Sequence, residues 1–254
     1  MEDMKKFCIS LPEWYGSLFR RSVVLPATIL FIAIQGCNSP ETSPSNPYDY
    51  FPLGIGRYQI YQVDEMVYSV GQKNPKISSW YEKDEIIRKD VEFSGGEVYI
   101  ASHSIRTTLS GYWQKVSEYS VTSYPDKIIL NQGNEIFTSL VFPYTPAVNW
   151  NGYQYFNLDK DDDRSGYLFH YEDLDQPLTI DSLKFDRTFK VSERSDTTGP
   201  LYFRLGYKQY ASGIGLVADQ LTNIDYLQEN GELVGYRTIG SGIRRTKKII
   251  AYGK

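Results

Sequence analysis

Apolar and polar side chains alternate along most of the chain after residue 50, and this period of two is typical of β-strands. Between residues 135 and 142, Ile136, Thr138 and Leu140 share one parity. None of the segments shows a 3.6-residue apolar period of the kind that predicts an amphipathic helix. The pattern therefore predicts an all-β domain with little helix outside the N-terminal region.

Turn signals separate the alternating segments at short intervals. Ser94-Gly95-Gly96, Gly133-Asn134 and Asn230-Gly231 are sequences that favour tight hairpin turns. The expected strands lie at residues 58–70, 80–93, 97–109, 112–123, 127–132, 135–142, 167–172, 178–191, 202–211, 216–227, 233–239 and 246–252. Roughly ten short strands at this spacing predict an antiparallel curved sheet, barrel or sandwich. Dinucleotide-binding and phosphate-loop folds alternate strands with helices, so the pattern excludes them.

An apolar run of twelve residues, Val23–Ile34, stands near the N-terminus. A bilayer-spanning helix needs about 20 apolar residues, so this run has the length of an export-signal core. Arg20 and Arg21 precede it, and Ile34-Gln35-Gly36 leads into Cys37. A branched aliphatic residue, a small residue and then cysteine resemble a bacterial lipobox. That resemblance implies that residues 1–36 are a lipoprotein signal peptide and that Cys37 is lipidated.

The remaining chain divides into two parts. Residues 37–49 are rich in Ser, Pro and Asn and predict an extended, lipid-anchored tether. Residues 50–254 have the length of a single β-domain. An uncleaved signal anchor, or a core helix followed by a chance cysteine, would be the alternatives for the apolar run. Pro26 and the lack of a polar face argue against the core helix.

Charge and cysteine content narrow the range of functions. The chain has 27 Lys and Arg residues against 31 Asp and Glu, a net charge of −4, so nucleic acid is not an expected partner. Its two cysteines are Cys8 and Cys37. Cys8 would leave with the signal peptide, which excludes disulfides, thiolate metal sites and cysteine nucleophiles from the mature domain. The 22 tyrosines agree with a β-rich fold.

Short motifs spread through the domain resemble those of a known group of proteins. They are Tyr50-Phe51-Pro52-Leu53 with Gly56, Tyr58 and Tyr61; Leu140-Val141-Phe142-Pro143; Trp150-Asn151-Gly152; and Gly213-Ile214-Gly215-Leu216-Val217. In these motifs the chain resembles an uncharacterised family of Bacteroidetes-type lipoproteins. The resemblance implies a cell-envelope location, with the outer membrane expected and its periplasmic or surface side left open. Gln59 departs from the tryptophan that relatives often place there.

The same motifs have a structural explanation that does not depend on the family. Pro143 and Pro146 would end a strand and force a corner. The indole N–H of Trp150 could pin that corner to a carbonyl. Gly213 and Gly215 flank a position where the chain turns tightly or another backbone approaches. We therefore interpret these residues as structural rather than catalytic.

One acidic loop is a candidate metal site. Asp159, Asp161 and Asp163 alternate as the ligands of calcium loops do. Arg164 occupies the position where such loops need glycine, and Glu172 lies two places beyond the usual bidentate carboxylate. A solvated acidic turn is the favoured interpretation, and no cofactor is expected.

Catalytic signatures are weak. His103 and His170 are the only histidines, and no G-x-S-x-G nucleophile turn is present. Acidic residues are plentiful, but nothing singles out a catalytic pair. The basic run Arg244, Arg245, Lys247 and Lys248 is interpreted as an edge strand protected by charge.

The sequence thus predicts a cell-envelope lipoprotein with a non-enzymatic binding or structural β-domain. Its expected partners are the membrane, through Cys37, and a small apolar or sugar ligand or an envelope protein. The alternative is an envelope hydrolase acting on glycans or esters. That activity would require two carboxylates about 5–10 Å apart across a groove, or a histidine within about 3.2 Å of a serine hydroxyl.

Overall fold

Antiparallel strands form most of the described chain in a computed structural model, which describes residues 46–254 apart from 92–94, 160–161 and 163. A short 3-10 helix, η1 (Pro47–Tyr50), precedes the strands. The strands are β1 (Tyr58–Tyr68), β2 (Lys76–Lys89), β3 (Glu97–Arg106), β4 (Gln114–Tyr124), β5 (Lys127–Gln132), β6 (Glu135–Val141), β7 (Asn149–Trp150), β8 (Phe169–Ile180), β9 (Leu183–Asp196), β10 (Tyr202–Ala211), β11 (Gly215–Tyr226), β12 (Gln228–Glu229), β13 (Glu232–Leu233) and β14 (Ile239–Gly253). The prediction of an all-β antiparallel fold is confirmed.

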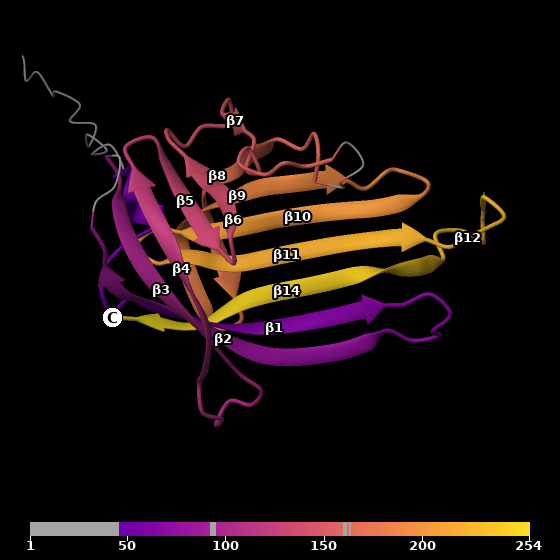
Figure 1. The fold of residues 1–254 in the computed structure, drawn as a ribbon, viewed down its shortest axis with the longest axis horizontal. Coiled ribbons are helices and arrows are strands. Elements are labelled where there is room, and N and C mark those ends of the chain that lie inside the picture. Colours follow the sequence, from indigo (N-terminus) through magenta and orange to yellow (C-terminus); the bar gives the residue numbers. More distant parts are fainter. Residues whose placement is uncertain (1–45, 92–94, 160–161, 163) are drawn as a thin grey trace, which may run out of the picture. The chain divides into compact units, whose positions relative to one another are not determined.

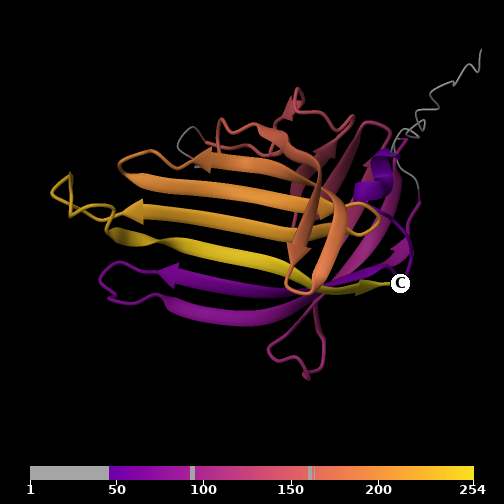
Figure 2. The same cartoon turned by 180° about the vertical axis from the view of Figure 1, so that it is seen from behind.

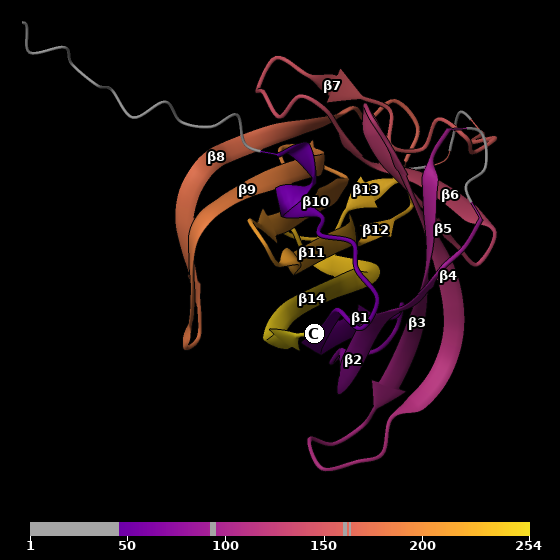
Figure 3. The same ribbon diagram turned by 90° about the vertical axis from the view of Figure 1, so that its left-hand side faces the viewer.

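Twelve of these strands form one sheet in the order β6-β5-β4-β3-β2-β1-β14-β11-β10-β9-β8-β7, and β12 pairs only with β13. The sheet curls until its two ends almost meet, as the view along the strands in Figure 3 shows. Register shifts at Ile60/Tyr61, Gly206/Tyr207 and Gln209/Tyr210 mark bulges, which bend strands and increase their twist. Of the three predicted architectures, the curved sheet or barrel is therefore correct.

Side chains join the two ends of the sheet along a seam between β6 and the β7–β8 region. The Trp150 indole donates to the Thr138 carbonyl at 2.9 Å, and the Thr138 amide donates to the Gly152 carbonyl at 2.9 Å. Tyr171 completes the join, because its hydroxyl donates to the Val141 carbonyl at 2.6 Å and accepts from the Val141 amide at 3.0 Å. The predicted role of Trp150 in pinning a corner to a carbonyl is confirmed.

An aromatic core fills the barrel behind this seam. Its buried members include Tyr50, Trp150, Tyr171, Phe189 and Tyr210. Their rings meet at centroid distances of 4.5–5.4 Å in tilted or edge-to-face arrangements, which favour aromatic pairs. Tyr50 reaches this core from η1, so the start of the domain closes one end of the barrel (Figure 3).

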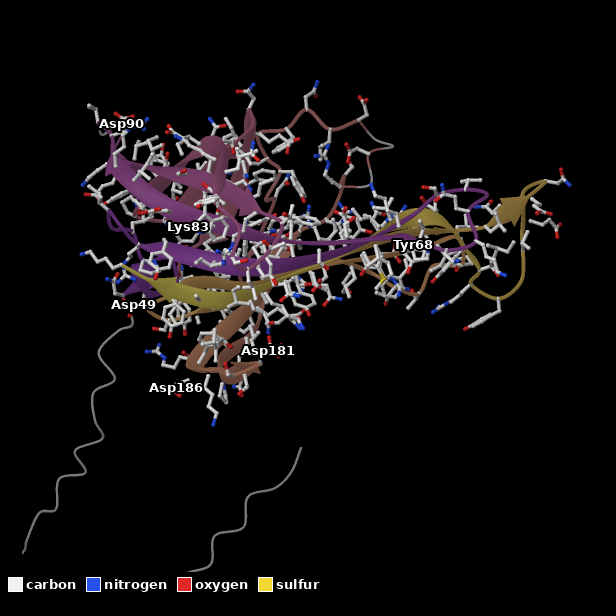
Figure 4. All side chains as sticks on the ribbon, turned by 90° about the horizontal axis from the view of Figure 1, so that it is seen from below. Asp49, Tyr68, Lys83, Asp90, Asp181 and Asp186 are labelled. Carbon is white, nitrogen blue, oxygen red and sulfur yellow. The ribbon has the colours of Figure 1, made fainter. Side chains whose placement is uncertain are left out.

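The β8–β9 hairpin bends around the outside of the sheet. Ile180 and Phe185, near its tip, pack in a second core cluster with Val217 and Ile249. Figure 2 shows the hairpin crossing the back of the sheet, and Figure 4 shows Asp181 and Asp186 projecting beside β14. The long strands β1, β14, β11 and β10 continue past this double layer towards Tyr68 (Figures 1 and 4).

Several predicted strand boundaries were wrong: β2 lies four residues earlier than the predicted 80–93, and two other regions differ more. Residues 178–191 were expected to form one strand, but Asp181, with a φ of 51°, makes the turn between β8 and β9. Asp tolerates this left-handed backbone through local hydrogen bonding, a weaker signal than Asn-Gly. Residues 233–239 were expected to form a return strand, yet only Glu232–Leu233 pair there, and β14 begins at Ile239 and runs through Gly240 and Gly242.

Other predictions fall outside the described residues. The signal peptide (residues 1–36), Cys37 and most of the tether belong to that part of the chain. Within residues 46–254, where described, none of the helices is long and apolar enough to cross a membrane.

Tyr171→Phe should destabilise the domain. Loss of the hydroxyl leaves the amide and carbonyl of Val141 without their partner, and each buried unsatisfied group costs about 1–3 kcal/mol. We expect a lower urea midpoint with an unchanged m-value. Tyr112→Phe is the control, because Tyr112 is 99% exposed and surface changes stay within about 0.5 kcal/mol. Equal midpoints for both variants would show that the hydroxyl does not hold the seam.

Candidate functional site

A row of charged side chains crosses the inner face of the sheet. Residues directly opposite each other on antiparallel strands share a face. Lys247 on β14 lies opposite Asp219 on β11, and Asp219 lies opposite Lys208 on β10. Glu82 lies opposite Tyr61, and Asp84 lies opposite His103. Acidic and basic groups therefore alternate across the inner wall.

Lys247 is the centre of one cluster. Its amine lies 2.8 Å from Glu82 Oε2 and 3.2 Å from Asp84 Oδ2, and 4.2 Å from the centroid of the Tyr61 ring. Burial favours the neutral amine, but Asp84 and Glu82 outweigh it and raise the pKa of Lys247 above its ordinary value. The lysine is therefore a fixed cation held between two carboxylates.

Asp84 also holds His103. Its Oδ1 lies 2.8 Å from His103 Nδ1, and both side chains are 14% exposed. Burial opposes the charge on Asp84, yet Lys247 and His103 together lower the pKa of its carboxyl. The hydrogen bond to Asp84, working against burial, raises the pKa of His103. The imidazolium–carboxylate pair is thus favoured by its surroundings.

A second ion pair lies further along the wall. Lys208 Nζ lies 2.5 Å from Glu193 Oε1, with the lysine side chain about a quarter exposed. Burial lowers the pKa of Lys208, but Glu193 and Asp219 raise it more strongly, and the net shift is upward. Burial also raises the pKa of Glu193, despite the attraction of Lys208. Lys208 is accordingly a second fixed cation of the inner wall.

Three adjoining cavities follow these residues, and we call them together the trough. An apolar recess of about 90 Å³ is lined by Phe51, Leu53, Ile86, Val121 and Leu130, among others. A middle cavity of about 370 Å³ shares Asp84, Tyr119, Leu130, Lys208 and Leu216 with the recess. An outer cavity of about 370 Å³ shares Lys208, Asp219 and Arg245 with the middle one. Lys208 therefore borders the whole trough.

Two half-buried charged side chains of the trough have no partner among the described hydrogen bonds and ion pairs. None of the hydrogen bonds or ion pairs found among the described residues uses the side chain of Asp219 or of Arg245. Asp219 stands between Lys247 and Lys208 in register, but those lysines bind Glu82, Asp84 and Glu193 instead. One carboxylate and one guanidinium thus face the same two cavities.

The predicted calcium loop can be compared with the structure only in part. Asp161 and Asp163 lie outside the described residues, and Asp159 makes no described ion pair. Asp162 binds Arg164 through both carboxylate oxygens, at 2.9 and 2.8 Å. This contact lowers the pKa of Asp162 to about 2. Across the described part of the chain, no group of three His, Cys, Asp or Glu side chains converges as metal ligands would.

The histidines do not form a hydrolytic triad. His103 lies opposite Ser117 on β4, so Asp84, His103 and Ser117 follow one another across three strands. Among the described hydrogen bonds, however, neither histidine contacts a serine hydroxyl; His170 binds Glu172 at 2.9 Å. Glu82 and Asp84 come from one strand and share Lys247, so they do not face each other across a groove.

The interpretation of the basic run was wrong, and it concealed part of the site. β14 is not an edge strand, because it pairs with β1 and β11 in the middle of the sheet. Arg245 and Lys247 face the trough, whereas Arg244 and Lys248 are exposed on the opposite face. Because alternate residues of a strand lie on opposite faces, the sequence could have assigned Arg245 and Lys247 to one face and Arg244 and Lys248 to the other.

Comparison with known proteins adds little. Neither a protein-family model nor a curated protein matches the chain. Among solved structures, one described as a candidate lipoprotein from Parabacteroides distasonis aligns at 12% identity, covering 80% of this chain and 98% of its own, with a TM-score of 0.39. A candidate exported protein with a YmcC-like fold from Bacteroides fragilis aligns at 12% identity, covering 81% and 99%, with a TM-score of 0.39. TM-scores this low do not establish a shared fold.

Stability should depend on pH through Asp84 and His103. Because the pKa of His103 is raised in the folded state, the histidine adds to the free energy of unfolding at pH values below its ordinary pKa near 6.5. This added stability is lost as the pH rises through the raised pKa. Because the pKa of Asp84 is lowered in the folded state, the aspartate adds to the free energy of unfolding at pH values above about 4. This added stability is lost as the pH falls through the lowered pKa. The pair therefore stabilises most between about pH 4 and 6.5.

Urea denaturation of wild type and His103→Gln at pH 6 and pH 8 measures this effect. The wild type should lose unfolding free energy between the two pH values, and the variant should lose less. His170→Gln, outside the cluster, is the control and should keep the wild-type difference. A difference that survives in His103→Gln would contradict the assignment to this imidazole.

Proposed function

We propose that the chain is a lipid-anchored cell-envelope protein whose β-domain binds a ligand in the trough without transforming it. The observation that carries the proposal is the trough itself. Three adjoining cavities join an apolar recess to a charged wall, and Asp219 and Arg245 offer free polar groups there. Concave sites with apolar walls and a few convergent polar groups are the usual form of ligand sites.

The arrangement of charges supports binding over a purely structural role. A sheet wall that served only to fill a barrel would be more stable with apolar side chains, since desolvating ions costs several kcal/mol each. Here Lys208 and Lys247 each carry carboxylate partners and remain 26% and 15% exposed beside open space. Fixed ion pairs that reach solvent in a cavity provide preorganised donors and acceptors.

The envelope hydrolase is less well supported. Asp84, His103 and Ser117 stand in the right order, but the nucleophile–base hydrogen bond that activates a serine is not among the described contacts. His103 is held by Asp84 through Nδ1, so its other nitrogen is the one that a serine would need. The binding function therefore has the stronger support.

Membrane attachment rests on the lipobox-like sequence before Cys37. Cys37→Ala should abolish fatty-acid labelling in the native host, and the variant should leave the membrane fraction in high salt. One acyl chain binds membranes only marginally, whereas two or more hold stably, at about 0.8 kcal/mol per buried CH₂. Wild type recovered without lipid and with Met1 retained would refute the anchor.

Ligand binding in the trough can be measured by thermal unfolding with small molecules extracted from the envelope of the producing bacterium. A ligand at 100 times its Kd adds about 2.7 kcal/mol, which should raise the melting temperature of wild type by several degrees. The Asp219→Leu/Arg245→Leu double variant should not respond. Arg244→Leu, on the opposite face of β14, is the matched control. Equal shifts in all three proteins would place binding elsewhere.

A further inference from the structure

We propose that the ligand is an uncharged oligosaccharide that carries a short acyl substituent, such as an N-acetyl group. This inference rests on the proposed binding function and names the class of ligand. It follows from three features of the trough: its charge balance, the two unpartnered groups and the position of the apolar recess.

The charges of the trough favour an uncharged ligand. The middle and outer cavities are lined by five acidic residues, Glu82, Asp84, Glu135, Glu193 and Asp219, and by five Lys and Arg residues, Arg164, Arg194, Lys208, Arg245 and Lys247. His103, paired with Asp84, also lines the middle cavity, so the two signs of charge nearly balance. An anionic ligand would meet these carboxylates, and a cationic ligand would meet the lysines and arginines. A charged ligand placed beside side chains of the same charge loses binding free energy through repulsion, and this loss is larger in a partly buried site.

Asp219 and Arg245 suit a hydroxylated ligand. A carboxylate only accepts hydrogen bonds, and a guanidinium only donates them. A saccharide hydroxyl does both, so neighbouring hydroxyls can donate to Asp219 and accept from Arg245. Since both residues line the middle and the outer cavity, a chain of sugar units lying along the trough would contact them in passing.

The apolar recess identifies the substituent. Its volume of about 90 Å³ is several times the minimum for one water, and Phe51, Leu53 and Val121 make its wall apolar. A space of this size with an apolar wall accepts a short acyl group. Tyr119 lines both the recess and the middle cavity, and its hydroxyl makes none of the described hydrogen bonds. It is therefore placed to donate to an acyl carbonyl at the junction.

Calorimetric titration of the purified full chain distinguishes these features. The probes are three trimers with related backbones: tri-N-acetylchitotriose, cellotriose and the cationic glucosamine trimer. We expect the acetylated trimer to bind at least about tenfold more tightly than either of the others, which corresponds to about 1.4 kcal/mol. Its affinity should change little with added salt, because an uncharged ligand releases no counterions.

Variants connect this preference to the trough. Asp219→Ala and Arg245→Ala should each weaken the acetylated trimer about tenfold or more, and Arg244→Ala should leave it unchanged. If Asp219→Ala does not fold, Asp219→Asn replaces it. Leu130→Phe narrows the recess and should remove the preference for the acetylated trimer over cellotriose. Unaltered affinity in the trough variants would overturn the proposal.

Further outcomes would also overturn the proposal, and the last two separate it from the proposed function. Equal affinities for the acetylated trimer and cellotriose would show that the recess does not bind an acyl group. Binding of an uncharged acetylated dipeptide amide in place of all three trimers would identify a peptide site. If envelope extract stabilises wild type but none of the saccharides binds, the ligand class is wrong while trough binding stands. If neither the envelope extract nor any saccharide binds, both the ligand class and the proposed binding function are wrong.

Discussion

The closing of the sheet on itself is the constraint on which the rest of the structure depends. A sheet of this size must leave two edges, and uncovered edges expose backbone donors and acceptors that cost free energy and invite aggregation. Here Trp150 and Tyr171 bring side-chain hydrogen bonds to the backbone of β6, replacing a full strand-to-strand ladder. The long strands β1 and β14 extend beyond this join towards Tyr68 (Figures 1 and 4).

This partial closure explains why one inner surface is both core and site. Towards η1, aromatic side chains fill the space between β5 and β9 and exclude water. Further along the same strands the wall borders the trough, and partly buried charged residues replace the aromatics. Tyr210 and Lys208 show the change within two positions of one strand. The ionic wall costs desolvation free energy, which is the kind of local conflict that functional sites retain.

Much of the fold can be predicted from the sequence, because the alternation of strands and the Gly-containing turns depend on residues that are close together in the chain. Strand β5, for example, has the boundaries that the alternation predicts, and Asn134 and Gly133 adopt the positive φ values of their turn. The turn at Asp181 and the start of β14 were missed, since Asp-Ser is a weaker turn signal and Gly240 and Gly242 suggest a break. Gly242 is instead required inside the strand, because a Cβ there would lie 2.2 Å from the Asn223 carbonyl.

The site was harder to predict, because it depends on which strands are neighbours. Arg245 and Lys247 look like edge protection until β14 is placed between β1 and β11. In this central position, alternate side chains of β14 lie on the two faces of the sheet. Arg244 and Lys248 keep the outer face polar. Arg245 and Lys247 lie on the inner face, near carboxylates from β2 and β11. The order of strands in the sheet brings together residues more than 150 positions apart in sequence, such as Lys247 and Asp84. This order places half of the charged run in the wall of the trough.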